Sequence, residues 1–61
     1  MGFDNEKFTK WLKDFETALI DSGMPQHQAM RYRTEYYSDA VAHFAADRTP
    51  DDAAVRELLN I

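Results

Sequence analysis

The two histidines are the first candidates for metal chemistry in this 61-residue chain. His27 and His43 lie 16 residues apart, which is not a metal-ligand spacing. Asp39 and His43 lie four residues apart, so on a helix they share one face and could contact an ion together. Two such residues on a solvated face usually form only a hydrogen-bonded pair. We therefore expect no metal site and no cofactor.

The remaining parts of an enzyme active site are also missing from the sequence. The chain has no cysteine and no glycine-rich phosphate loop, and it places no serine, histidine and aspartate around a plausible cavity. A chain of 61 residues leaves little room for a pocket that excludes water. We expect a non-catalytic protein without a small-molecule substrate.

Three lysines near the start look basic in the printed sequence. On a helix, however, Lys7 points away from Lys13, and acidic residues lie between the lysines, so we interpret Lys7, Lys10 and Lys13 as part of a solvated face. Seven Lys and Arg against eleven Asp and Glu give a net charge of −4, which repels a polyanion such as DNA. The expected partner is therefore another protein rather than nucleic acid.

The size and composition predict one helical domain covering residues 1–61. At this length a single core leaves about 3 to 5 kcal/mol of net stability. Without cysteine there is no disulfide to add to it, so tight helix packing or self-association must do so. No apolar run approaches about 18 residues and no signal-peptide pattern is present, which favours a cytoplasmic chain without membrane contact.

The first helix is predicted over about residues 4–22. Asp4 is placed to cap its start, with Phe3 and Phe8 as a hydrophobic staple. Gly23 can end it in the left-handed conformation, with Met24 folding back on the helix. The apolar residues recur at steps of three and four on one side: Phe8, Trp11, Leu12, Phe15, Ala18 and Leu19.

The last helix is predicted over about residues 50–60, and its start is the most specific local signal in the chain. Thr49 is an N-cap residue, Pro50 suits the first helical position, and Asp51 and Asp52 favour the positive end of the helix dipole. A helix this short is not stable alone in water. We expect its apolar side, which includes Ile61, to pack against the far flank of the central segment.

The central segment, residues 25–47, is predicted to be one helix that organises the fold, because it contains no helix breaker after Pro25. Its apolar residues spread over roughly 220° of the helical wheel, so it needs neighbours on two sides. The tight turn before it predicts an antiparallel hairpin with the first helix, with Trp11 at the edge of the seam. The fold class is thus an all-α three-helix module, for which we also expect a dimer.

The contact residues expected on this module lie mostly in the central segment. Arg33 falls within the apolar arc, where it must extend to solvent, pair with a carboxylate or mark a subunit seam. Tyr36 and Tyr37 are expected in the core with their hydroxyls at its rim, and Tyr32 at an interface. The predicted partner-binding residues are Tyr32, Arg33, Met30, Tyr37 and Ile20, in a protein-binding or regulatory module that also binds itself as a homodimer.

Four short motifs lie along the chain in a defined order. They are Met24-Pro25, Glu35-Tyr36, Thr49 and the run from Ala54 to Leu58. This layout resembles the small bacterial HAAS-type helical domain, although Leu59-Asn60-Ile61 stand where that family has Gly-Asp-Pro. The resemblance implies a regulatory, protein-contacting module without catalysis, and it transfers no functional residue.

A second likeness rests on Gly23 through Tyr32-Arg33 and on the spacing from Phe44 to Leu58. These positions resemble the helical N-terminal core-binding domain of tyrosine recombinases. That resemblance implies DNA contact, which is the alternative function and which the acidic balance of the chain opposes. Inhibition of a host protein by a phage or mobile-element product is a further alternative for a small acidic protein.

Overall fold

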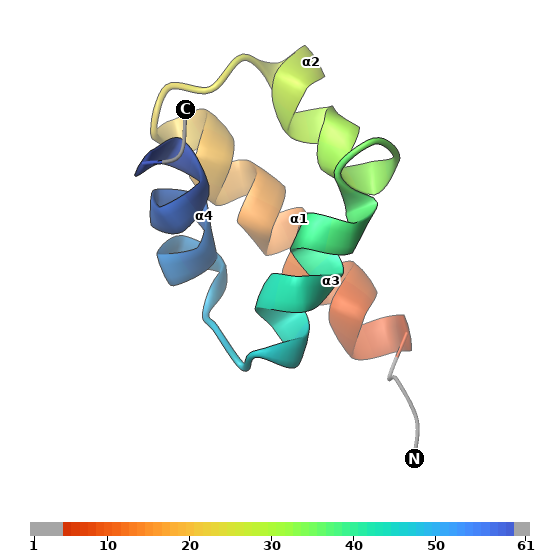
Figure 1. Ribbon diagram of the computed structural model, residues 1–61. Coiled ribbons are helices and arrows are strands. Elements are labelled where there is room, and N and C mark those ends of the chain that lie inside the picture. The colour runs from red at the N-terminus through yellow and green to blue at the C-terminus, as the bar shows by residue number, and fades with distance from the viewer. Residues whose placement is uncertain (1–4, 60–61) are drawn as a thin grey trace.

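The computed structural model describes residues 5–59, which are all-α. They form four α-helices and one short 3₁₀ helix: α1 Asn5–Asp21, α2 Gln26–Ala29, η1 Met30–Arg33, α3 Tyr37–Ala45 and α4 Pro50–Leu59. Figure 1 shows α4 on one side of α1 and the segment from α2 to α3 on the other. Within the described residues, none of these helices has the length and apolar character needed to cross a membrane.

Helix α1 ends as the sequence predicts. Gly23 adopts a positive φ of 110°. The Met24 N–H donates to the Leu19 carbonyl at 3.0 Å, and the Gly23 N–H donates to the Ile20 carbonyl at 3.0 Å. These two bonds define a Schellman stop, which buries Met24 beside the end of the helix. The predicted cap at Asp4 and its staple residue Phe3 lie outside the described residues.

The predicted start of α4 is confirmed as well. The Asp52 N–H donates to the Thr49 hydroxyl at 3.2 Å, and Pro50 is the first helical residue. The cap satisfies one of the backbone donors that every helix leaves free at its start. Ile61, which was expected on the apolar side of this helix, lies outside the described residues.

The prediction of one central helix over residues 25–47 is wrong. The segment consists of α2, η1, a turn at residues 34–36 and then α3. The backbone leaves the helical region at Thr34, with φ −131° and ψ −80°, and at Tyr36, with φ −108° and ψ 27°. The chain therefore forms four α-helices instead of three within residues 5–59.

Tertiary contacts of the residues just before the turn account for the break. Tyr32 is 5 % exposed, and its hydroxyl donates to Glu57 of α4. Its neighbour Arg33 pairs with Glu16 of α1. Local propensity within a segment is a weak prior that such contacts can override.

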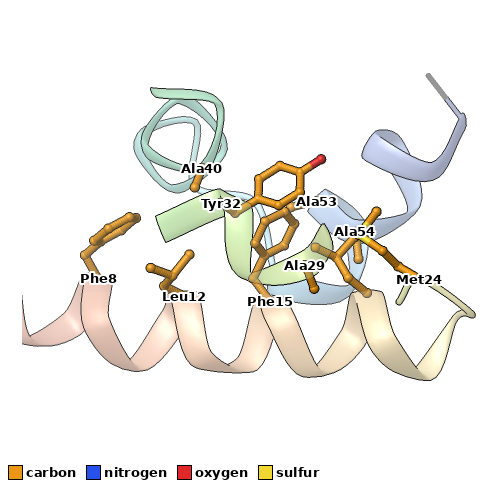
Figure 2. Packing of buried hydrophobic residues seen from close by; sticks show 10 residues of the cluster. Phe8, Leu12, Phe15, Met24, Ala29, Tyr32, Ala40, Ala53 and Ala54 are labelled. Atoms are coloured by element: carbon orange, nitrogen blue, oxygen red, sulfur yellow. The ribbon is translucent and has the colours of Figure 1, made fainter. Parts of the chain in front are cut away.

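Helix α1, rather than the central segment, organises the core. Figure 2 shows Phe8, Leu12 and Phe15 pointing from α1 toward the other elements. Those elements contribute mainly small side chains to the core, which lets their backbones come close to α1. These side chains are Ala29, Ala40, Ala53 and Ala54, each at most 1 % exposed. Helix α4 packs most extensively on α1 and reaches the central segment mainly through Glu57, which corrects the expectation that it packs on the far flank of that segment.

Candidate functional site

A chain of polar side chains is buried between η1, α3 and α4. The Tyr32 hydroxyl donates to Glu57 Oε1 at 2.6 Å, and His43 Nε2 lies 2.6 Å from Glu57 Oε2. On the other side of the imidazole ring, Arg48 lies 2.9 Å from His43 Nδ1. The side chains of His43 and Glu57 are only 10 % and 13 % exposed.

The geometry of this cluster fixes where its protons lie. The Arg48 guanidinium can only donate, so His43 Nδ1 must accept and the imidazole proton sits on Nε2. His43 then donates to the Glu57 carboxylate, which also accepts from Tyr32. Burial and the hydrogen bond to Glu57 raise the pKa of the Tyr32 hydroxyl well above its usual range. No buried side-chain nitrogen or oxygen in residues 5–59 lacks a partner, which favours a structural role for the cluster.

The same cluster contains His43, the histidine that the sequence offered as a metal ligand together with Asp39. Both ring nitrogens of His43 are occupied, by Arg48 and by Glu57 rather than by Asp39. His27 lies exposed on α2. The described part of the chain contains no group of three or more potential ligand residues that could hold a metal ion.

Arg33 forms the ion pair that was one of its three predicted environments. Its Nε donates to Glu16 Oε2 at 2.6 Å and a terminal nitrogen donates to Oε1 at 2.8 Å, so the contact is bidentate. These hydrogen bonds and the negative charge of Glu16 raise the pKa of Arg33. The Glu16 side chain is 9 % exposed whereas that of Arg33 is 54 % exposed, so the guanidinium covers the carboxylate from the solvent side.

Beside this ion pair lies an open groove of about 670 Å³ along the first half of α1, which we call the α1 groove. Its charged lining residues are Lys10, Lys13 and Arg33 against the single acid Glu6. The full lining comprises Asn5, Glu6, Phe8, Thr9, Lys10, Leu12, Lys13, Arg33 and Tyr37. Apolar and aromatic surface is thus edged by positive charge, in a chain whose net charge is −4.

The structure brings some predicted contact residues together. Arg33 and Tyr37 both line the α1 groove. Ile20 lies one helical turn beyond Glu16 on α1, and Met30 is the first residue of η1, three residues before Arg33. Ile20 is 41 % exposed and Met30 48 % exposed.

The expected roles of the tyrosines are reversed. Tyr32, expected at an interface, is in the core, where its ring meets Phe15 edge-on at 5.2 Å. Tyr36 and Tyr37, expected in the core, are 36 % and 44 % exposed. For Tyr37 the physical reason is the turn at residues 34–36, because it rotates the residues after it away from the faces they would occupy in a continuous helix. Tyr32 precedes that turn and lies in η1, where the 3₁₀ geometry gives it a different position from that in an α-helix.

Sequence reasoning missed three residues of this region. Lys10 and Lys13 were interpreted only as solvated, although they edge the α1 groove. Glu16 carried a signal that could have identified it. It follows Leu12 by four residues and precedes Leu19 by three, so its carboxylate lies at the border of the buried stripe and requires a cation.

Trp11 behaves as predicted at the edge of the core. It is half-buried, and its indole N–H donates to the Arg48 carbonyl at 2.9 Å. Its ring stacks on Phe15 with centroids 5.1 Å apart.

Comparison with protein-family models, with curated proteins and with solved structures found no match to this chain.

Proposed function

We propose that this chain is a non-catalytic protein-binding module whose α1 groove receives a segment of another protein that carries both acidic and apolar side chains. The observation that carries the proposal is the composition of the groove. Three cationic side chains and one acid edge a floor that includes Phe8, Leu12 and Tyr37.

The charge distribution supports an acidic partner. The chain as a whole is acidic, and two of its acids, Asp51 and Asp52, lie in the first turn of α4. Figure 1 shows α4 on the side of α1 away from the segment that contributes Arg33 and Tyr37 to the groove. The groove is therefore a local exception that favours encounter with a negatively charged segment. Glu16 neutralises part of the Arg33 charge, so Lys10 and Lys13 supply most of the attraction.

Apolar contact would supply the remaining affinity. Tyr37 is exposed enough to be covered by a partner while its ring rests edge-on against Phe8, with centroids 5.6 Å apart. Ile20 and Met30 are further exposed apolar residues, on the two elements that the Arg33–Glu16 ion pair joins. Aromatic and arginine side chains of this kind are enriched among the residues that dominate binding energy.

A pull-down from the native host with matched variants tests this function. The wild type is expected to capture a protein that the double variant Lys10→Glu/Lys13→Glu no longer retains. Lys7→Glu is the control, because it reverses a charge on the same helix outside the groove lining. Binding is also expected to weaken as salt rises, because charges at the edge of an interface are screened.

Two results would contradict the proposal. One is capture that the groove variants leave unchanged. The other is retention of duplex DNA at low salt that the same double variant abolishes, which would favour the DNA-binding alternative. The variants must keep the wild-type circular dichroism spectrum and melting temperature for either result to count.

A further inference from the structure

The segment from Pro25 to Asp47 is broken at a place where its sequence contains no helix breaker. The residues of the turn and of η1 include good helix formers such as Met30, Arg31 and Glu35. Yet Thr34 N–H and Tyr36 N–H both donate to the Arg31 carbonyl, at 3.0 Å each, instead of bonding four residues back. Nothing local to the segment forbids a continuous helix there.

The contacts that maintain the broken form connect the two sides of the turn. Before the turn, α1 and η1 contribute Trp11 and Tyr32; after it, the chain contributes the Arg48 carbonyl and Glu57 as their partners. The Trp11 and Phe44 rings also meet across it, with centroids 5.7 Å apart. None of these contacts requires that both partners belong to the same copy of the chain.

We propose that two copies of this chain exchange α3 and α4, with the turn at residues 34–36 of each copy straightened so that η1, which keeps Tyr32 in the core, continues directly into α3. The partner is thus a second copy, and the surface is the core face that α1 and η1 present to α3 and α4. The exchange gives a specific form to self-association and does not rest on the α1 groove.

The chemistry of the interface favours a second copy over any other occupant. Every contact that closes the monomer is available again between two opened copies, so the dimer needs no new complementary surface. Each straightened segment also gains the regular helical hydrogen bonds that the turn at residues 34–36 lacks. The balance between the two forms is then set by that turn and by the concentration of the chain.

Substitutions at Thr34 test the role of the turn, because this residue is exposed and its replacement removes no core contact. Thr34→Ala favours the helix in both copies of the dimer, so its dissociation constant is expected to fall about tenfold; Thr34→Gly should raise it about fourfold. The matched control is Thr17→Ala, an exposed threonine of α1 that is helical in both forms. Sedimentation equilibrium over a range of concentrations measures these constants.

Isotope-filtered NMR on a mixed dimer of labelled and unlabelled copies tests the exchange itself. Cross-peaks between Trp11 and Phe44 are expected between copies, whereas those between Phe15 and Tyr32, whose rings meet on one side of the turn, should stay within a copy. The proposal is overturned if wild type and Thr34→Ala stay monomeric up to the solubility limit, if Thr34→Ala dimerises no more tightly than Thr17→Ala, or if the dimer shows Trp11–Phe44 cross-peaks only within copies.

Discussion

The hydroxyl of Tyr32 links the middle of the chain to its last helix. It donates to Glu57, which also holds His43, so one carboxylate joins η1, α3 and α4. Because Tyr32 is only 5 % exposed, its hydroxyl cannot exchange its partner freely for water. Such buried networks stabilise one arrangement of helices because any other arrangement leaves a polar group unpaired.

The Tyr32→Phe variant is expected to lose less stability than the wild type at alkaline pH. An unfolded tyrosine has a pKa of about 10, whereas burial and Glu57 raise the pKa of Tyr32 in the folded state. Above about pH 10 the unfolded state therefore binds fewer protons, and the free energy of unfolding falls by up to about 1.4 kcal/mol per pH unit. Below that pH this contribution is fully present.

Urea unfolding between about pH 9 and pH 12 measures the effect, within the range where tyrosines titrate. Tyr37→Phe, the same change at an exposed tyrosine, controls for the loss of a hydroxyl at the surface. An identical pH dependence for wild type and Tyr32→Phe would show that folding does not raise the pKa of the Tyr32 hydroxyl.

Two arginines of the central segment give a matched pair for testing ion-pair strength. Arg33→Met leaves the buried Glu16 carboxylate without its bidentate partner and should cost about 1 to 2 kcal/mol. Arg31→Met removes only an exposed contact to Glu35, 3.4 Å long, and should cost at most about 0.5 kcal/mol. Urea unfolding at neutral pH compares the two, and equal costs would mean that the burial of Glu16 carries no energetic weight.

At the scale of the elements, the predictable boundaries are those set by local chemistry. Gly23 acts through backbone hydrogen bonds and Thr49 through its side-chain hydroxyl, which accepts from the Asp52 N–H. Both act within a few residues, so their effects can be deduced from the sequence. The break at residues 34–36 depends on contacts across the turn, such as that of Tyr32 with Glu57, which is distant in sequence. No local pattern contains that information, and the predicted single helix failed for this reason.

The groove could be predicted only in part for the same reason. Arg33 and Tyr37 were among the predicted partner-binding residues, but their meeting with Lys10 and Lys13 depends on how the broken segment lies against α1. Tyr32 was misplaced because its position on a continuous wheel differs from its position in η1.

The end of α3 offers a stabilising substitution. Asp47 has a φ of 63°, and the Arg48 N–H donates to the His43 carbonyl at 3.2 Å, as in a Schellman stop. Glycine adopts this conformation without a Cβ penalty and removes a carboxylate from the negative end of the helix dipole. Asp47→Gly is expected to raise the free energy of unfolding by about 0.5 to 1 kcal/mol.

Asp47→Ala is the matched control, because it removes the same carboxylate but keeps a Cβ atom in the left-handed region. Thermal unfolding should rank Asp47→Gly above wild type and Asp47→Ala below Asp47→Gly. If alanine stabilises the chain as much as glycine does, charge rather than backbone conformation governs this position.

For the whole molecule, the main feature is that large and small side chains of the core come from different helices. Helix α1 supplies bulky residues such as Phe15 and Leu19, both fully buried, and its neighbours supply alanines. One long helix therefore contributes to both the core and the α1 groove, and Phe8 and Leu12 belong to both. The groove and the proposed exchange of α3 and α4 both depend on the turn that separates η1 from α3.

The ¹³Cα secondary shifts of the monomeric chain test that turn most directly. At concentrations where sedimentation shows a monomer, helical shifts are expected across residues 26–33 and 37–45, with an interruption at residues 34–36 and cross-peaks between the Phe15 and Tyr32 rings. Uninterrupted helical shifts from residue 26 to residue 45 in the monomer, without those cross-peaks, would contradict the account.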